Sequence, residues 1–314
     1  MGVGTKIIVA TDSWHGSVEW CKAFEGSLPD TLFFPWDDSG EPVGADYAIV
    51  WRPAPTLFVR ETRLRAVFNL GAGIDSLVGL PELPADLPIV RLEDAGMAEQ
   101  MVEYVVYGLL RASREFSAYE AQQRAGEWSG LPPVNRSHWP VGVMGLGVIG
   151  ERVARAVVRL GYPVAGWARR AREIPGAQVY VGAEQLPAFL ARTRVLVNLL
   201  PLTPETDSIL NRENLERLMP QAYLINVARG QHLVEQDLLD LLASGRFAGA
   251  LLDVFRSEPL PQSHPFWKHP AITVTPHISA ITLREDAVNQ IVNKIGKLKQ
   301  GLPISGRVSR EHGY

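Results

Sequence analysis

The chain has 314 residues, 46% hydrophobic and 21% charged, an ordinary balance for a globular protein of about two domains. A formal net charge of −3 gives neither the basic footprint of a nucleic-acid-binding protein nor a polybasic membrane patch. The single cysteine, Cys21, excludes an intramolecular disulfide and a multi-thiolate metal site, and it favours a reducing, cytoplasmic compartment. Residues 1–6 do not resemble a signal peptide, and no run of 18 apolar residues occurs, so we expect neither secretion nor a membrane span.

Short apolar segments alternate with segments of helical periodicity along much of the chain. The expected strands are residues 6–10, 47–51, 66–70, 89–91, 141–144, 164–167, 195–199, 223–226, 249–253 and 272–275. The expected helices include residues 148–160, 183–191, 234–244 and 284–300. Alternation of helices with nearly all-apolar strands predicts parallel sheets that are covered on both faces.

A boundary between two sheets is expected before residue 141. Residues 96–128 are predicted to form one long helix, and a loop rich in turn formers follows at 129–136. The apolar positions of this helix are Val102, Val105, Val106, Leu109 and Leu110. One sheet therefore occupies the first hundred residues and a second starts near 140, while the last helix, 284–300, can pack on either.

The sharpest local motif is the glycine-rich turn Gly145-Leu146-Gly147-Val148-Ile149-Gly150. Its G-x-G-x-x-G spacing follows an apolar strand and opens a helix, which is the context of a dinucleotide-binding turn. Gly145 permits the tight turn, Gly147 leaves room for a pyrophosphate, and Gly150 lets the helix pack closely. The helix N-terminus would offer N–H groups to the phosphates. A glycine-rich packing turn without a ligand is the alternative.

The end of the strand at 164–167 bears on the type of cofactor. NAD-dependent enzymes usually carry Asp or Glu there, to bind the ribose 2′-hydroxyl. This chain has Ala168-Arg169-Arg170 and no carboxylate before Glu173. Two guanidinium groups suit a 2′-phosphate, which favours NADP(H) and leaves NAD(H) possible. A merely solvated pair of surface arginines is the alternative.

Several blocks in series make the chain resemble the D-2-hydroxyacid dehydrogenase family over nearly its whole length. They are residues 69–75, 145–150, 199–206, 226–230, 252–261 and 275–280. Trp51 and the ending Gly313-Tyr314 favour the bacterial glyoxylate/hydroxypyruvate reductase A branch. The resemblance implies an α/β protein of two doubly wound parallel-sheet domains. A flavodoxin-like substrate domain would comprise residues 1–100 plus 285–314, and a Rossmann domain that binds NAD(P) would comprise 101–284.

The resemblance also implies roles for individual residues. Arg229 matches the arginine that binds the substrate, Glu258 the acid that hydrogen-bonds the catalytic histidine, and His277 the general acid/base. The implied cofactor contacts are Gly145, Leu146, Gly147, Val148, Ile149, Gly150, Arg169, Arg170, Leu200, Pro201, Thr206, Val227, Ala228 and Asp253. The implied substrate contacts are Trp51, Gly71, Ala72, Gly73 and Arg229, the glycine-rich turn acting as a backbone nest for a carboxylate. No metal is implied.

Each of these residues also has a structural alternative when it is taken alone. Arg229 could be a surface arginine, and Glu258 a solvated carboxylate in a turn. By residue type and position alone, His277 ranks only slightly above His232 and His264.

The chemistry of 2-keto acid reduction explains why these residue types occur together. The substrate is a small anion with a carbonyl, so an arginine can hold its carboxylate and polarise its oxygen. His277 would donate the proton as hydride arrives from the nicotinamide, and Glu258 would favour the imidazolium form. Arg229, Glu258 and His277 all follow expected strands, where open α/β sheets bind ligands.

We therefore expect an NADPH-dependent reductase of glyoxylate and hydroxypyruvate. A reductase of bulkier keto acids such as phenylpyruvate, and a cofactor-sensing interaction protein on the same fold, stay open. A phosphoglycerate dehydrogenase is disfavoured, because no additional phosphate-binding cluster is visible. The expected partners are a small anionic 2-keto or 2-hydroxy acid and, by the family's use of the segment at 97–128, a second copy of the chain.

Overall fold

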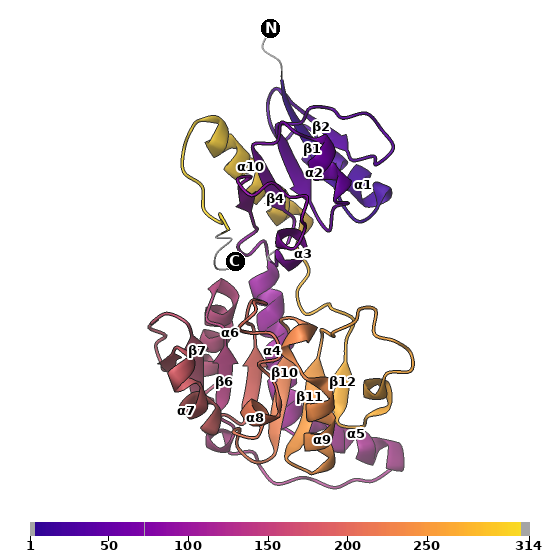
Figure 1. Ribbon diagram of the computed structural model, residues 1–314. Coiled ribbons are helices and arrows are strands. Elements are labelled where there is room, and N and C mark those ends of the chain that lie inside the picture. Colours follow the sequence, from indigo (N-terminus) through magenta and orange to yellow (C-terminus); the bar gives the residue numbers. More distant parts are fainter. Residues whose placement is uncertain (1–3, 72, 309–314) are drawn as a thin grey trace. The chain divides into compact units, whose positions relative to one another are not determined.

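The computed structural model describes residues 4–71 and 73–308 (Figure 1). Its chain divides into two compact units, one from residues 1–96 and 282–314 and the other from residues 97–281. Each unit is built around one sheet whose strands all run parallel, which confirms the predicted α/β fold with two parallel-sheet domains. Within the described residues, no helix has both the length and the apolar character needed to cross a membrane.

The smaller unit contains a five-stranded sheet in the order β2-β1-β3-β4-β5, which is the flavodoxin-like order. Its strands are β1 Thr5–Ala10, β2 Thr31–Pro35, β3 Tyr47–Val50, β4 Ala66–Asn69 and β5 Ile89–Val90. Its helices are α1 Trp14–Phe24, α2 Thr56–Arg60, α3 Asp75–Val78 and α10 Arg284–Lys299. Every residue of β3 and β4 is buried, as expected for inner strands with both faces covered.

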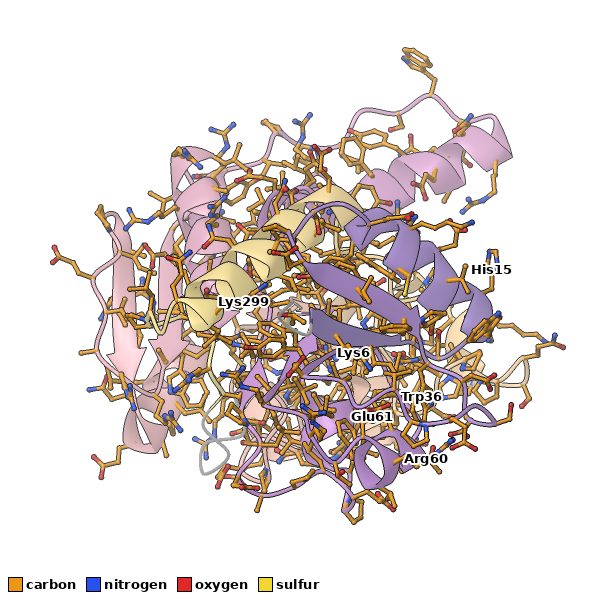
Figure 2. All side chains as sticks on the ribbon, turned by 90° about the horizontal axis from the view of Figure 1, so that it is seen from above. Lys6, His15, Trp36, Arg60, Glu61 and Lys299 are labelled. Carbon is orange, nitrogen blue, oxygen red and sulfur yellow. The ribbon has the colours of Figure 1, made fainter. Side chains whose placement is uncertain are left out.

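The C-terminal helix α10 belongs to this smaller unit, although it is far away in the sequence. The Nζ atom of Lys294 on α10 is buried and donates to the carbonyl oxygen of Arg91 at 2.9 Å, and it lies 3.2 Å from Oε2 of Glu93. Figure 2 shows α10, labelled at Lys299, beside α1, labelled at His15. These contacts explain why the chain returns to the first sheet after completing the second.

The larger unit contains a seven-stranded sheet in the order β12-β11-β10-β9-β6-β7-β8. Its strands are β6 Val141–Met144, β7 Val164–Ala168, β8 Ala177–Val181, β9 Val195–Asn198, β10 Ala222–Asn226, β11 Phe247–Leu252 and β12 Ile272–Val274. Its helices are α4 Met97–Ser113, α5 Phe116–Ala125, α6 Val148–Arg159, α7 Leu186–Ala191, α8 Arg212–Leu215 and α9 Glu235–Ala243, with 3-10 turns at Arg136–His138, Ala183–Gln185, Gly230–His232 and Pro265–Lys268. One apolar cluster packs residues of α4 and α6 on the sheet, and another packs residues of α7, α8 and α9. The sheet is therefore covered on both sides, as predicted.

The single long helix expected at residues 96–128 is wrong. The structure has two helices, α4 and α5, separated at Glu115, whose φ of 54° lies in the left-handed region. Val105 and Leu109 of α4 are fully buried, whereas α5 has no buried residue. The apolar stripe that holds α4 on the sheet does not continue past the break, so nothing requires one straight helix.

Two edge strands were missed because neither contains a buried residue, unlike the edge strand β5, which is buried and was predicted. Strands β2 and β8 pair with one neighbour only, and neither contains a buried residue. Each is an edge strand that is only partly covered, so its sequence lacks the continuous apolar run of a buried inner strand. Pro35, at the end of β2, is tolerated for the same reason.

Candidate functional site

The glycine-rich turn joins β6 to α6 in the larger unit. Gly145 has a φ of 93°, which other residues adopt at a cost, and a Cβ there would lie 2.7 Å from the carbonyl oxygen of Leu199. A Cβ on Gly150 would lie 1.8 Å from the carbonyl oxygen of Gly145, so this glycine lets the helix approach the turn. A Cβ on Gly147 would meet no described atom within 4 Å. Two of the glycines thus serve packing, and Gly147 borders open space.

The side chains of the same turn divide in a similar way. Leu146 is buried against Gly166 of β7, whereas Val148 is exposed. Gly147 is the N-cap of α6, and no side chain of a described residue caps it. The first N–H groups of this helix therefore face the space beside Gly147, and the partial positive charge of the helix end favours an anion there.

Arg169 and Arg170 follow β7, the neighbour of β6, and both are exposed. A hydrogen bond from Thr203 lowers the pKa of the Glu205 carboxyl, and the charge of Arg169 adds a smaller effect in the same direction. Arg172, two residues further on, is committed to an ion pair with Glu151 of α6 at 3.6 Å. The sequence-predicted arginines therefore stand at the carboxyl end of the second strand of the Rossmann unit, the position that meets a ribose in dinucleotide-binding folds.

Two buried asparagines at the ends of β9 and β10 shape the next loops. The Nδ2 of Asn198 donates to Oδ1 of Asn226 at 3.0 Å, and both residues are inaccessible to solvent. Asn198 also accepts the N–H of Leu200 at 3.3 Å, and Asn226 accepts that of Ala228 at 3.3 Å. These asparagines hold the loops that carry Leu200, Pro201, Val227 and Ala228. Sequence analysis gave Asn198 no role; its polar type at the end of an apolar strand was the available signal.

Thr206 stabilises the loop after β9 from within. Its hydroxyl donates to the carbonyl oxygen of Pro201 at 2.7 Å and accepts the N–H of Thr203 at 2.8 Å. Thr206 therefore sets the course of the loop that holds Leu200 and Pro201.

Arg229 follows β10 in an extended conformation, and the adjacent Gly230 explains how it is held. A Cβ on Gly230 would lie 1.8 Å from the carbonyl carbon of Phe255, so the two loops pack backbone against backbone. The guanidinium of Arg229 donates to the carbonyl oxygen of Ala228 at 2.6 Å. Only a glycine at position 230 allows the loop of Arg229 to lie so close to the loop after β11.

His232 is fully buried and connects this loop to the loop after β9. Its Nδ1 lies 3.3 Å from the backbone N of Arg229, and its Nε2 lies 3.3 Å from the carbonyl oxygen of Pro201. With its proton on Nε2, the ring accepts from Arg229 and donates to Pro201. Burial lowers the pKa of His232 below its usual value, which keeps the ring neutral in this structural position.

Asp253 follows β11 and is inaccessible to solvent. Its Oδ1 accepts the hydroxyl of Thr275 at 2.6 Å and the N–H of Ile278 at 2.8 Å, and its Oδ2 accepts the N–H of Ser279 at 2.8 Å. The carboxylate thus organises the turn that carries His277. The resemblance implies that Asp253 contacts the cofactor, but its carboxylate is buried and bonded within the turn.

His277 and Glu258 form the hydrogen-bonded pair that the resemblance implied. The Nδ1 of His277 lies 2.8 Å from Oε2 of Glu258, and the Oε1 of Glu258 accepts the N–H of Phe255 at 3.0 Å. The histidine side chain is 39% exposed, and Nε2 is the ring nitrogen that does not face Glu258. Such a ring can pass a proton to a bound molecule while its far side is held.

The residues named so far share one edge of the larger sheet. Arg229, Glu258 and His277 follow β10, β11 and β12, which are neighbouring parallel strands (Figure 1). The glycine-rich turn follows β6 in the same sheet. Because parallel strands end at the same edge, all these groups lie at the carboxyl edge, where open α/β sheets bind ligands.

The substrate contacts expected in the smaller unit form a group of their own. The ring of Trp51, after β3, packs on Gly71, after β4, where a Cβ would lie 2.3 Å from the ring. Asn69 is buried and its Nδ2 donates to the carbonyl oxygens of Gly71 and Gly73 at 2.9 and 2.8 Å. Asn69, missed by sequence analysis, therefore folds the turn. Ala72, another predicted contact, lies outside the described residues.

Other reactive groups have less suitable surroundings. Burial raises the pKa of the Cys21 thiol to about 12, so the thiolate that a nucleophile needs is scarce at neutral pH. His264 pairs with Glu235 at 3.3 Å and packs on Phe266. Among residues 4–71 and 73–308, no group of three or more His, Cys, Asp or Glu side chains could hold a metal ion.

The chain is similar in sequence and in structure to known proteins. Residues 106–279 match the family model of the D-isomer specific 2-hydroxyacid dehydrogenase, NAD binding domain. The glyoxylate/hydroxypyruvate reductase A of Serratia proteamaculans (strain 568) is 45% identical over 312 residues, which cover 98% of this chain and 99% of the relative.

Two solved structures are similar over the whole length. An NADPH-dependent glyoxylate/hydroxypyruvate reductase from Sinorhizobium meliloti, in complex with NADP and sulfate, superposes with a TM-score of 0.93 at 37% identity, covering 99% of this chain and all of that one. A D-isomer specific 2-hydroxyacid dehydrogenase from Xanthobacter autotrophicus Py2, in complex with NADPH and MES, has a TM-score of 0.93 at 36% identity and full coverage of both chains.

Proposed function

Because the chain belongs to the D-isomer specific 2-hydroxyacid dehydrogenase family, we propose that it reduces glyoxylate to glycolate and hydroxypyruvate to glycerate with NADPH. The observation that carries the proposal is the His277–Glu258 pair, 2.8 Å apart, on the sheet edge that also bears Arg229 and the glycine-rich turn. Relatives at 45% and 37% identity carry the name of this activity, which supports the choice of substrates.

The residues around the glycine-rich turn suit a dinucleotide phosphate. The open space at Gly147, the uncapped start of α6 and the exposed Arg169 and Arg170 provide room, N–H donors and positive charge. With Gly145, Leu146, Val148, Ile149 and Gly150, the loop residues Leu200, Pro201, Val227 and Ala228 complete the proposed cofactor site. Thr206 and Asp253 contribute through the loops that they hold. Bound NADPH would supply the hydride.

Arg229 and His277 divide the remaining work. The guanidinium of Arg229 binds the carboxylate of the keto acid and polarises its carbonyl oxygen. The Nε2 of His277 gives a proton to that oxygen as the carbonyl carbon becomes tetrahedral, so the product leaves as a hydroxy acid. Glu258 holds Nδ1 and stabilises the positive ring before transfer.

The smaller unit carries its own candidate substrate contacts. We propose that the backbone N–H groups of Gly71 and Gly73, whose carbonyl oxygens accept from Asn69, bind the substrate carboxylate. Trp51, which packs on Gly71, would limit the size of the substrate's side chain. Residues 1–100 with 285–314 are thereby assigned to substrate binding, and residues 101–284 to the cofactor.

The direct test is NADPH oxidation, followed by absorbance, with a panel of keto acids. We expect turnover of glyoxylate and hydroxypyruvate, with phenylpyruvate a poor substrate. Preferential turnover of phenylpyruvate would assign the chain to bulkier keto acids. NADPH binding without turnover of any panel member would identify a cofactor-sensing protein.

We further propose that the enzyme is a homodimer that uses α5 and the segment after it. Helix α5 has no buried residue, Phe116 and Tyr119 on it are exposed, and Trp128 is fully exposed. Large exposed apolar side chains on a segment without buried residues mark a candidate interaction surface. Light scattering at micromolar concentration should give twice the 34.6 kDa chain mass, and a monomeric mass would contradict the dimer.

The cytoplasm is the compartment that we propose for this enzyme. Its only cysteine, Cys21, is held as an unreactive thiol, which fits a compartment where disulfides are rare. The reductase activity should therefore remain in the cytoplasmic fraction when cells are separated into compartments.

A further inference from the structure

A chain of hydrogen bonds runs from helix α4 to the turn that carries His277. The Oη atom of Tyr104 on α4 lies 2.5 Å from Oγ1 of Thr275, and Oγ1 of Thr275 lies 2.6 Å from Oδ1 of Asp253. A carboxylate accepts hydrogen bonds and cannot donate them, so the hydroxyl of Thr275 donates to Asp253. Thr275 has one proton, and therefore Tyr104 donates to Thr275.

The turn that carries His277, at the end of this chain of hydrogen bonds, has an unfavourable backbone conformation. His277 has a φ of 57°, in the left-handed region that residues with a Cβ rarely adopt. Its N–H donates to the carbonyl oxygen of Asp253 at 2.9 Å, and the next two N–H groups, of Ile278 and Ser279, donate to the Asp253 carboxylate. An unfavourable backbone conformation persists only where surrounding contacts determine it.

The phenol of Tyr104 is well suited to anchor this arrangement. Burial raises its pKa, so the group stays protonated and remains a donor. Helix α4 is fixed on the sheet by the buried residues Met101, Val105 and Leu109, which flank Tyr104 along the helix. The hydrogen bond from Tyr104 therefore holds Thr275, and through it Asp253, in a fixed position relative to helix α4.

We propose that Tyr104 is a positioning residue for His277, acting through Thr275 and Asp253. The inference rests on the proposed function, in which His277 is the proton donor. Tyr104 itself touches neither substrate nor cofactor in this role. It fixes the turn so that the ring of His277 meets Glu258 on one side and presents Nε2 on the other.

The kinetic test compares Tyr104→Phe with Tyr107→Phe, an exposed tyrosine one turn further along α4. Loss of one hydrogen bond should lower kcat of Tyr104→Phe by roughly fivefold, with the KM for NADPH changed less than twofold. Tyr107→Phe should behave as the wild type. A kcat of Tyr104→Phe equal to that of Tyr107→Phe would overturn the proposal.

Substitutions of Thr275 test the route. Thr275→Val should lower kcat at least as much as Tyr104→Phe, and Thr275→Ser, which keeps the hydroxyl, should restore most of it. If the two residues act in one chain, the double variant Tyr104→Phe/Thr275→Val should be no slower than Thr275→Val alone. Additive losses would contradict a shared route.

A measurement without turnover separates this proposal from the proposed function. The ring signals of His277 in an NMR spectrum, assigned with His277→Gln, should shift in Tyr104→Phe and stay unchanged in Tyr107→Phe. The tyrosine and phenylalanine side chains differ only by the hydroxyl group, so the shift reports the hydrogen bonds of that hydroxyl. Unchanged His277 signals in Tyr104→Phe overturn the proposal even if keto-acid turnover is found, and a shift supports it even if none is found.

Discussion

Glu258 joins two loops through its two carboxylate oxygens. Its Oε2 lies 2.8 Å from Nδ1 of His277, after β12, and its Oε1 accepts the backbone N–H of Phe255, after β11. The hydrogen bond from Phe255 fixes the orientation of the Glu258 carboxylate, and the carboxylate in turn fixes the orientation of the His277 ring. In the proposed reaction, the same charge stabilises the imidazolium that gives up the proton.

Replacing Glu258 by glutamine should lower kcat by roughly 100-fold, the lower end of what positioned acid–base groups contribute. The amide can still accept from Phe255, but it carries no charge to stabilise the protonated ring. Glu235→Gln is a matched control, because Glu235 pairs with His264 at 3.3 Å in the same unit. Steady-state kinetics in which both variants lost equal activity would remove Glu258 from the proton-transfer step.

The glycines of the cofactor turn should separate into binding and packing positions. Gly147→Ser puts a good N-cap residue where no described atom is in the way, so its unfolding free energy should stay within about 0.5 kcal/mol of the wild type. NADPH binding should weaken about tenfold or more, since the new side chain occupies the phosphate space.

Gly150→Ala is the control for this glycine prediction. Its Cβ would lie 1.8 Å from a carbonyl oxygen, so we expect a loss of about 1–3 kcal/mol of stability. Denaturant unfolding and NADPH fluorescence titration measure both quantities. Unaltered NADPH affinity in Gly147→Ser would show that the cofactor does not use this turn.

Arg169 and Arg170 should determine the preference for NADPH. Replacing both by alanine removes the donors that would meet the 2′-phosphate, and each hydrogen bond to a charged group contributes about 1.5–3 kcal/mol. The KM for NADPH should rise at least tenfold, with little change for NADH. Arg172→Ala, which loses only the ion pair with Glu151, should leave both constants near their wild-type values. An equal rise for NADPH and NADH would reject the assignment.

His232 should make the fold sensitive to acid. Its pKa is lowered by burial in the folded state, so the unfolded chain binds a proton more readily. The contribution of His232 is therefore complete above its ordinary pKa near 6.5 and is lost as the pH falls below that value, by up to about 1.4 kcal/mol per pH unit.

Denaturant unfolding tests the role of His232 when it is measured at about pH 7.5 and about pH 5.5, one value above and one below the ordinary pKa of histidine. His232→Gln should lose less stability than the wild type between the two conditions, because it has no ring to protonate. A pH dependence identical in both proteins would mean that another group controls acid unfolding.

The parts of the fold that sequence could predict are those whose burial fixes residue type. The inner strands, such as β6, and the glycine-rich turn have surroundings that admit few alternatives, so their sequence is diagnostic. Sequence could not predict the edge strands β2 and β8, because they contain no buried residue and so show no apolar pattern. The break at Glu115 was missed for a similar reason, because α5 beyond it is not buried.

The same distinction applies to the candidate site. Arg229, Glu258 and His277 stand in recognisable blocks, whereas Asn198 and Tyr104 act through partners far along the chain. Tyr104 and Thr275 are 171 residues apart and meet only after α4 packs on the sheet. Such pairs are determined by tertiary structure, and their residue types alone do not indicate them.

In the proposed reaction, His277 delivers the proton during reduction by NADPH. The most direct measurement is the kcat of His277→Ala with glyoxylate and NADPH, together with the affinity of that variant for NADPH by fluorescence titration. We predict that kcat falls by about 10²–10⁴-fold while NADPH affinity stays within twofold of the wild type. Turnover near the wild-type rate at neutral pH would contradict the claim and require another proton donor.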